Sequence, residues 1–300
     1  MFLALRQQAV ASGEADLSPY KPLLRFERIG GSRLFTYYGL PQGCDTLLFP
    51  GCGLPGTRPQ ATWQLFFHLR RSTPKLGIGL DCCCKPSHDL GRRASFESRF
   101  AAKLQLMMDR GIRKVLVACP NCYHVLQGYG GGLAVETVYE HMDRAGVPAN
   151  AVGNGPVALH DPCPLRWNGD VHDAVRRILH RIGVRTKEMK HRRKLTLCCG
   201  EGGGVGLHRP ELARSWQQIR GREADETPIL TYCAGCAGFL SQTLPTMHLL
   251  DLLFDPQNRL WGESRPAKSP WTYIHRLRLK WRFKKVFPNG FRKSGASSAA

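Results

Sequence analysis

Apolar positions follow two different periodicities along the chain. Short apolar runs of strand length occur at residues 47–49, 115–118, 157–160 and 229–232. Apolar residues at roughly helical spacing occur at residues 61–71, 96–110, 171–182 and 211–219. Strands that alternate with helices are typical of parallel sheets, because a helix usually connects one parallel strand to the next. The pattern therefore predicts an α/β fold.

The same order of segments occurs twice. The first half reads DTLLFPGC, LDCCCKP, VLVACPNC and VETVYEHM, and the second reads PVALHDPC, LTLCCGEGGG, ILTYCAGC and MHLLDLLF. A repeated order of this kind indicates two copies of one structural unit. We predict two tandem α/β units with parallel sheets, followed by a basic C-terminal tail. The cysteines then lie just past the carboxyl ends of strands, where open parallel sheets place their sites.

The repeat divides the chain into four predicted segments. They are a leading segment at 1–40, a first cysteine-rich unit at 41–152, a second at 153–256, and a tail at 257–300. No motif occurs in the leading segment, which we expect to pack against the first unit. Pro256, Pro266 and Pro270 indicate a linker, and the final SGASSAA predicts disorder.

Size and composition favour two folded units. The chain has 300 residues, of which 42% are hydrophobic, enough for each unit to bury its own core. The formal charge of +20 is uneven, because a strongly basic stretch runs from Lys268 to Lys293. Such charge raises the hypothesis of a nucleic-acid-binding metalloprotein. Nothing in the repeats offers a base-reading element, so we do not expect nucleic acid as the partner.

The cysteines indicate metal binding in a reducing compartment. Twelve cysteines occur, mostly as CC and CxxC groups, and their density is below that of a small disulfide scaffold. No stretch approaches the ~18 consecutive apolar residues that span a bilayer. The first residues have no basic opening followed by a sustained apolar core, so we expect no secretory signal. We predict a cytoplasmic protein.

Each half supplies a single cysteine, an adjacent pair and a CxxC. The predicted metal ligands are Cys52, Cys83, Cys84, Cys119, Cys122, Cys163, Cys198, Cys199, Cys233 and Cys236. A zinc site or a cubane cluster takes about four thiolates, so a fifth one indicates a centre with more metal positions. Neighbouring side chains on a strand point to opposite faces, which suits two metal ions better than one. Paired structural zinc stays open as the alternative, and Cys44 and Cys82 are predicted to be spare thiols.

Glycines in the second half suit a bulky cofactor. Gly200, Gly202, Gly203 and Gly204 let the backbone pass close to a cluster and offer N–H groups to its sulfides. The run lacks the lysine and Ser/Thr of a P-loop, and the dinucleotide fingerprint fails in this context. We therefore assign these glycines to the cofactor and not to a nucleotide.

Further polar residues near the cysteines have two interpretations each. His160 and Asp161 either shape the ligand loop and move protons to a reduced thiolate, or close a turn with Pro162. Lys85 either places a positive charge beside a cluster or an anionic substrate, or is an exposed loop lysine. We expect no ligand role for the three histidines near the ligand loops, which are His88, His124 and His208.

The spacing of the cysteines resembles that of a known family. The cysteine-rich CCG domain has a single cysteine, then a CC pair after about thirty to forty residues, then a CxxC after about thirty-five more. Both halves of this chain follow that pattern. Two tandem copies resemble the B-type subunit of heterodisulfide reductase and related bacterial lactate-utilisation and glycerol-dehydrogenase proteins. The resemblance covers about residues 46–254. It implies a noncubane [4Fe-4S] cluster on each set of five cysteines, with the two clusters together splitting a disulfide.

The two copies match this pattern differently. In the second copy, HDPC, CCGEGGG and CAGC match closely. In the first copy, Lys85 stands where the family usually has glycine, and Cys82 adds a third consecutive cysteine. Some relatives have zinc or an altered site in one half, so zinc is the alternative for the first copy.

These observations together predict an oxidoreductase component of a larger complex. It carries electrons through two cysteine-ligated clusters, either to reduce a disulfide or to pass electrons towards a quinone or a flavoprotein. No ferredoxin-type CxxCxxCxxxCP segment is present, so we expect electrons to arrive from a ferredoxin-type iron-sulfur or flavoprotein partner. The first rival hypothesis is a zinc-binding scaffold protein without catalysis.

The basic tail has its own pattern. Ile274, Leu277 and Trp281 follow helical spacing between arginines and lysines, which predicts an apolar stripe with cationic flanks. Such a helix can lie on an anionic membrane, dock on an acidic partner, or pack on its own domain. The first interpretation would place the protein at the inner face of the membrane.

Overall fold

The chain folds around two sheets with the same strand order. The computed structural model describes residues 2–149, 151, 155–242, 244–254 and 266–291. The first sheet has the order β1-β3-β2-β4-β5, with β1 (Tyr37–Gly39), β2 (Thr46–Phe49), β3 (Gly77–Leu80), β4 (Lys114–Val117) and β5 (Ala134–Thr137). The second has the order β7-β6-β8-β9, with β6 (Pro156–His160), β7 (Arg185–Glu188), β8 (Ile229–Thr231) and β9 (Thr246–His248).

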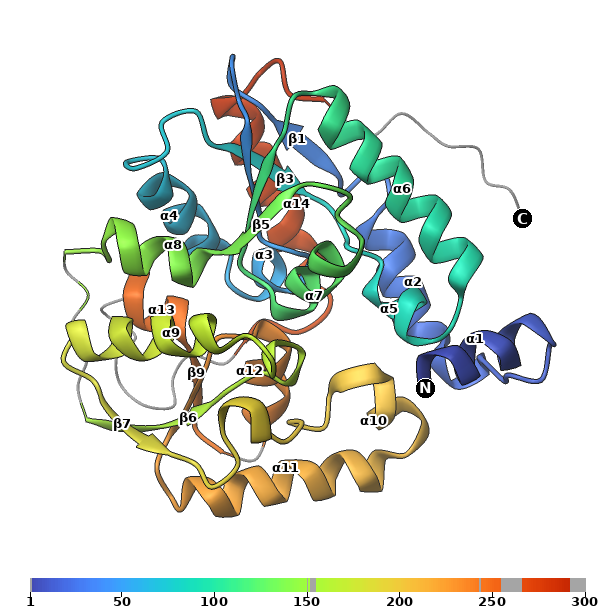
Figure 1. The fold of residues 1–300 in the computed structure, drawn as a ribbon, viewed down its shortest axis with the longest axis vertical. Helices are drawn as coiled ribbons and strands as arrows, with labels where there is room; N and C mark the ends of the chain where they lie inside the picture. The colour runs from blue at the N-terminus through green and yellow to red at the C-terminus, as the bar shows by residue number, and fades with distance from the viewer. Residues whose placement is uncertain (1, 150, 152–154, 243, 255–265, 292–300) are drawn as a thin grey trace.

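All neighbouring strands in both sheets are parallel, except that β1 pairs antiparallel with β3. Without β1, the two sheets have the same topology, in which the first strand of each copy lies between the second and the third. The predicted α/β class and the repeat are therefore confirmed. Figure 1 shows the first copy in blue to green and the second in yellow to orange.

Helices connect the strands. In the first half they are α1 (Phe2–Ala11), α2 (Lys21–Gly30), α3 (Gly53–Thr57), α4 (Pro59–Leu69), α5 (Lys85–Asp89), α6 (Arg93–Asp109), α7 (Pro120–Tyr129) and α8 (Val138–Ala145). In the second half they are α9 (Gly169–Arg181), α10 (Val205–His208), α11 (Pro210–Ala224), α12 (Ala234–Leu240), α13 (Leu249–Phe254) and α14 (Trp271–Val286). Short 3-10 turns occur at Ser18–Tyr20, Cys163–Leu165, Arg193–Leu195 and Gly202–Gly204.

The four predicted strands and four predicted helices all appear, as β2, β4, β6 and β8 and as α4, α6, α9 and α11. The pattern missed the other five strands, β1, β3, β5, β7 and β9. Among them, β3 has the sequence GIGL, whose glycines disfavour strands, and β7 has the polar sequence RTKE. Both are the second strand of their copy and pair with the buried first strand. Pairing with a buried neighbour therefore outweighs the low strand propensity of these segments.

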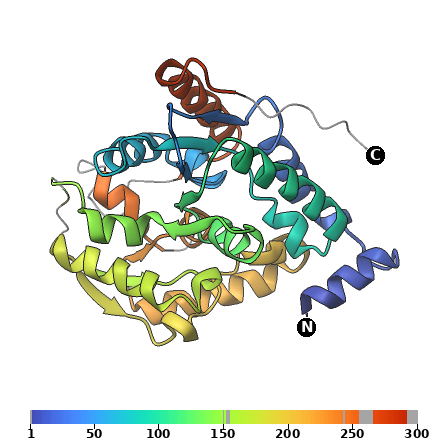
Figure 2. The same cartoon turned by 45° about the horizontal axis from the view of Figure 1, so that its top comes forward.

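The tail helix packs on the first copy. Helix α14 contacts α3, α4 and β1, and Tyr38 of β1 pairs with Phe291. Figure 2 shows α14, in dark red, lying across the first copy on the side away from the second. The segment β1, which belongs to the predicted leading segment, thus joins the first sheet and supports the tail.

The buried face of α14 differs from the predicted stripe. Arg276, Leu279, Lys280 and Phe283 are buried, whereas Trp281 is 59% exposed. The buried cations end on backbone carbonyls: Arg276 donates to Gly30 at 3.0 Å, and Lys280 to Arg33 at 3.0 Å. The long stems of these side chains are buried among apolar neighbours while their charged ends are hydrogen-bonded. Docking of the exposed face on a membrane or partner stays a prediction.

Parts of the predicted linker and tail lie outside the described residues. These parts are 255–265, which include Pro256, and 292–300, which include SGASSAA.

Replacement of Phe283 by alanine should destabilise the whole chain by about 3 kcal/mol, because large aromatic truncations in a core leave a cavity. The Phe283 ring lies 5.0 Å from that of Phe66 and 4.9 Å from that of Trp63, measured between centroids. Chemical denaturation of the full chain measures the loss. The control is Trp281→Ala on the exposed face, which should change the free energy of unfolding by at most about 0.5 kcal/mol. Equal effects of the two variants would contradict the packing of α14.

Candidate metal centres

The five cysteines of the second copy converge at one edge of its sheet. Cys163 follows β6, Cys198 and Cys199 lie in the loop after β7, Cys233 precedes α12, and Cys236 lies in its first turn. Their thiols form an unbroken chain of contacts, in the order Cys163, Cys198, Cys199, Cys236 and Cys233. Cys199, Cys233 and Cys236 are buried, and the other two are partly exposed. The centre therefore has one accessible side.

Backbone amides point at this group of sulfurs. The Gly200 N–H donates to Cys198 Sγ at 3.3 Å, and the Cys236 N–H donates to Cys233 Sγ at 3.3 Å. The Cys163 thiol, followed by the Cys199 thiol and backbone amides, holds the pKa of Cys198 well below its usual range. Thiolates are the form in which cysteine binds metal, so Cys198 is held in the ligating form. In contrast, the neighbouring thiols and burial raise the pKa values of Cys163, Cys199 and Cys236.

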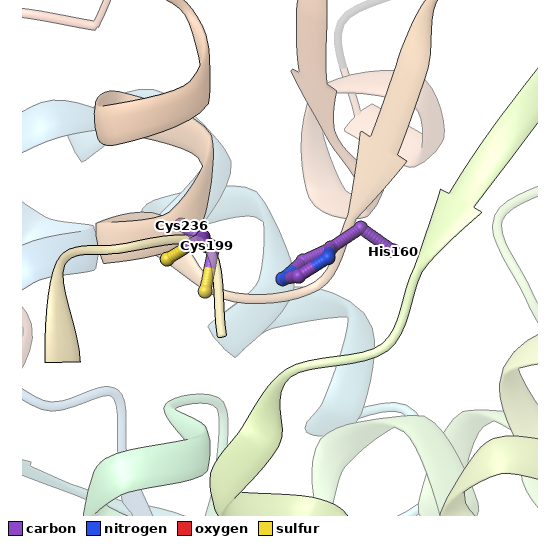
Figure 3. Close-up of side chains that lie close together, drawn as sticks. All are labelled: His160, Cys199 and Cys236. Atoms are coloured by element: carbon purple, nitrogen blue, oxygen red, sulfur yellow. The ribbon is translucent and has the colours of Figure 1, made fainter. Parts of the chain in front are cut away.

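His160 is a buried neighbour of the second centre. One of its ring nitrogens lies within 4.8 Å of the sulfurs of Cys199 and Cys236 (Figure 3). Burial, together with the nearby Arg220, lowers the pKa of His160 to about 3, so the ring is neutral. Arg220 Nε donates to His160 Nδ1 at 3.1 Å, so the proton of the neutral ring is on Nε2.

The tautomer decides what His160 can do. Nε2 is buried and has no hydrogen-bond partner among the described residues. A protonated Nε2 is a hydrogen-bond donor and cannot bind a metal at the same time. His160 is therefore suited to donate to a sulfur of the second centre. The sequence left two interpretations open for His160, a role at the ligand loop and closure of a turn with Pro162.

Asp161 lies in a polar network behind the centre. Its carboxylate accepts from Arg176 at 2.9 Å, from the Arg193 N–H at 2.8 Å and from the Tyr232 hydroxyl at 2.8 Å. Burial opposes ionisation, but Arg176 holds the pKa of Asp161 below its usual range. Asp161 thus connects the end of β6 to α9 and to Tyr232, the residue before Cys233. All three of these partners are groups other than the cysteine sulfurs.

The first copy brings its cysteines together in two groups. Cys83 and Cys119 both contact Cys122, and Cys52 contacts Cys82. A Cβ added to Gly51 would lie 3.0 Å from Cys122 Sγ and 3.0 Å from Cys119 Cβ. Glycine at position 51 therefore lets the backbone after β2 approach the CxxC motif closely.

Cys84 occupies a different environment. It is fully buried, and Lys103 Nζ donates to its Sγ at 3.2 Å. Lys103 is 2% exposed and lies 3.9 Å from the carboxylate of Asp81, which accepts from the Tyr38 hydroxyl at 2.9 Å. Burial alone would lower the pKa of Lys103, but Asp81 and Cys84 raise it, so the ammonium stays charged.

Sequence reasoning missed Lys103, although a signal exists. Phe96, Phe100, Lys103 and Met107 form the buried face of α6 at helical spacing. A lysine in such a stripe is an exception that indicates a buried anionic partner.

The remaining candidates lie at or beside the sites as follows. Lys85 is paired with Asp89 in the next turn of α5 and is largely buried. His88 contacts Asp89 and the Tyr129 hydroxyl, and Cys44 donates to the Thr46 carbonyl at 3.3 Å. These contacts occupy the polar atoms of His88, so no ligand role is needed to explain its burial.

The four glycines of the second copy divide into two groups. Gly200 has φ +103°, and a Cβ there would overlap the Ala213 carbonyl; a Cβ on Gly202 would lie 3.4 Å from Cys198 Sγ. Gly203 has free space around it, and Gly204 packs against Tyr20 and Leu23 of the leading segment. Only the first two glycines thus border the sulfurs.

One tyrosine connects the two centres. The Tyr139 hydroxyl lies 3.0 Å from the Tyr232 carbonyl oxygen and 3.4 Å from that of Ala118. These carbonyls immediately precede Cys233 and Cys119, so one buried side chain bridges the two CxxC motifs.

The donor set of the second copy fits an iron-sulfur cluster. All five thiols are free, they touch one another, and two backbone N–H groups donate to them. Thiolate ligands with amide donors are the usual surroundings of protein-bound iron-sulfur clusters. No helix among the described residues is long and apolar enough to cross a membrane.

Comparison with known proteins agrees with this chemistry. The family model described as a cysteine-rich domain, CCG, matches residues 46–127 and 157–241. The D-type subunit of dihydromethanophenazine:CoB–CoM heterodisulfide reductase from Methanosarcina barkeri is 30% identical over 210 residues, which are 61% of this chain and 49% of that protein. The chain thus spans about half the length of that relative. The relatives found include D-type subunits, and the predicted likeness to the B-type subunit in particular stays a prediction.

Two bacterial relatives are also redox proteins by name. The EtfAB:quinone oxidoreductase of Syntrophomonas wolfei is 26% identical over 43% of this chain and 19% of its own length. A probable iron-sulfur-binding oxidoreductase of Bacillus subtilis is 28% identical over 39% of this chain and 18% of its own length. Among solved structures, an aspartate racemase of Picrophilus torridus aligns with 69% of this chain and 89% of its own at a TM-score of 0.31 and 13% identity.

Replacement of Gly200 by alanine should remove metal from the second centre, because the new Cβ meets a carbonyl oxygen at a left-handed backbone position. Metal analysis and thermal unfolding measure the effect. The matched control is Gly203→Ala, which also has a positive φ, of +67°, but has nothing within 4 Å of the new Cβ. We expect this control to cost only about 1 kcal/mol of backbone strain and to keep its metal. Metal loss in both variants would contradict the steric argument.

Replacement of Lys103 by methionine should destabilise the protein by about 3 kcal/mol, because it leaves the buried Asp81 carboxylate without its cation. Urea denaturation of the full chain measures the loss. Lys194→Met, at an exposed lysine, is the control and should have little effect. If Lys103→Met leaves the free energy of unfolding unchanged, this buried pair does not contribute to stability.

Proposed function

The chain belongs to the CCG family of cysteine-rich domains, and we propose that it is an iron-sulfur redox subunit that resembles those of heterodisulfide reductase. The observation that carries the proposal is the unbroken contact of five free thiols in the second copy. Five thiolates exceed what one zinc ion or one cubane cluster takes. We therefore propose a noncubane [4Fe-4S] cluster on the second copy and a second cluster on the first.

A bound cluster of this kind supplies one-electron storage. The chain supplies the surroundings of that chemistry. The Gly200 and Cys236 amides donate to ligand sulfurs, and we propose that His160 Nε2 donates to a third sulfur atom. Hydrogen bonds to sulfur stabilise added negative charge, so these donors favour the reduced state of the second centre.

The reacting face is proposed to lie on the accessible side of the sulfurs. In the second copy, Cys163 and Cys198 are the partly exposed ligands, and in the first copy, Cys52 and Cys119 are partly exposed. Tyr139 bridges the two CxxC motifs, which supports a joint action of the two centres. We propose that a disulfide, or the cluster of a partner, approaches this side.

The proposed partner is a redox protein with a flavin or ferredoxin-type clusters. Relatives of this chain carry the names of heterodisulfide reductase and of an EtfAB:quinone oxidoreductase. Residues 1–300 contain no ferredoxin-type cysteine run, so the proposal places the source of electrons outside this sequence. The identity of the disulfide or quinone belongs to that complex.

Anaerobically purified protein should be brown and hold about four irons and about four sulfides per copy of the motif. Cys233→Ser should remove the iron of the second copy and leave that of the first, because Cys233 belongs to the second-copy group through its contact with Cys236. Iron, zinc and acid-labile sulfide are measured together with electron paramagnetic resonance spectra of the reduced protein. Cys44→Ser is the control, since this thiol bonds to a carbonyl away from both sites. Colourless protein with stoichiometric zinc in both copies would refute the proposal and favour the scaffold hypothesis.

A further inference from the structure

We propose that the ligand pair of the first copy is Cys82 and Cys83, and that Cys84 takes the structural place of the family's glycine. This inference rests on the proposed function. It differs from the sequence pattern, which assigns Cys83 and Cys84 as ligands and leaves Cys82 spare. Three consecutive cysteines fit either register, and the matched geometry of the second copy decides between them.

The first argument comes from the neighbours of each thiol. In the second copy, Cys198 contacts the single cysteine of that copy, Cys163. In the first copy, the residue that contacts the single cysteine, Cys52, is Cys82. Cys82 therefore has the position of Cys198.

The other member of the pair gives the same register. Cys199 contacts Cys236, which is the last cysteine of its CxxC. Cys83 contacts Cys122, which is the last cysteine of the first-copy CxxC. Cys83 therefore has the position of Cys199.

The backbone after each pair repeats as well. The Gly200 N–H donates to Cys198 Sγ at 3.3 Å, and the Cys84 N–H hydrogen-bonds to the Cys82 sulfur. Gly200 has φ +103° and Cys84 has φ +60°, both in the left-handed region. A residue other than glycine is rare there. Cys84 is thus the third residue of a CCG turn in which cysteine replaces glycine.

The side chain of Cys84 lies beside a buried lysine. Its Sγ accepts from Lys103 Nζ at 3.2 Å and lies 3.9 Å from the Cys82 carbonyl oxygen. In the second copy the corresponding residue has no side chain, and its position is closed by the Ala213 carbonyl and the Phe239 ring. In the first copy, the Cys84 thiol instead contacts the buried Lys103, which pairs with Asp81.

The proposed register also changes the residue with which Lys85 aligns. Lys85 aligns with Glu201, the residue that follows Gly200, and no longer with the family's glycine. The first copy then holds five thiols, and its two groups of contacts repeat the contacts at the two ends of the second-copy chain. The five thiols are those of Cys52, Cys82, Cys83, Cys119 and Cys122.

Serine substitutions distinguish the two registers. Cys82→Ser should remove about half of the iron and sulfide and abolish the spectrum of the first centre, as Cys83→Ser should. Cys84→Gly, which introduces the residue found in the second copy, should keep the full content. Each variant is also made on the Cys233→Ser chain, in which any remaining iron belongs to the first copy. Circular dichroism and thermal unfolding show whether each variant is folded.

The inference is overturned if Cys84→Gly loses first-copy iron while folded, or if Cys82→Ser retains it. Failure of the proposed function gives a different result, because wild-type protein would then hold zinc and no sulfide. In that case the register is read from the zinc content of the same variants.

Discussion

Parallel strands of a sheet end at the same edge, and this geometric constraint assembles both groups of cysteines. Each copy places its first strand between the second and the third, so the loops after these strands leave side by side. A cysteine in each loop is then brought within contact of the others, although more than sixty residues separate the first from the last. Thiols from three distant segments thus meet because the strands before them are parallel neighbours.

The turn after each adjacent cysteine pair explains how both members serve one centre. On a strand, neighbouring side chains would point to opposite faces. In the structure the pair lies in a loop whose next residue is left-handed, with φ +103° at Gly200. This turn directs the amide of Gly200 back at Cys198 and lets Cys198 and Cys199 contact different partners. The two thiols therefore lie next to different neighbours, which suits different positions of the proposed cluster.

Buried polar bonds join the two copies. Arg58, after α3 of the first copy, pairs with Asp251 of α13 at 2.7 Å, and both side chains are less than 10% exposed. Tyr139 of the first copy bonds to the Tyr232 carbonyl of the second. Such groups lose hydration on burial and need matched partners, so they favour one relative placement of the copies. Because the cysteines lie in loops that follow the strands of each copy, fixing the two copies also fixes the two groups of sulfurs relative to each other.

Periodicity and local motifs are enough to establish the α/β class, the repeat and the cysteine-bearing loops. Apolar periodicity reports burial directly, and the CC and CxxC groups are local in the chain. Tertiary contacts, in contrast, settle which face of α14 is buried, because Arg276 and Lys280 reach carbonyls of the segment before β1. They also place Lys103 beside Cys84, Arg220 behind His160, and Cys82 against Cys52. These contacts join residues that are far apart in the sequence and are brought together by the fold of the backbone. A run of three cysteines does not show by itself which of them adopts the left-handed backbone conformation.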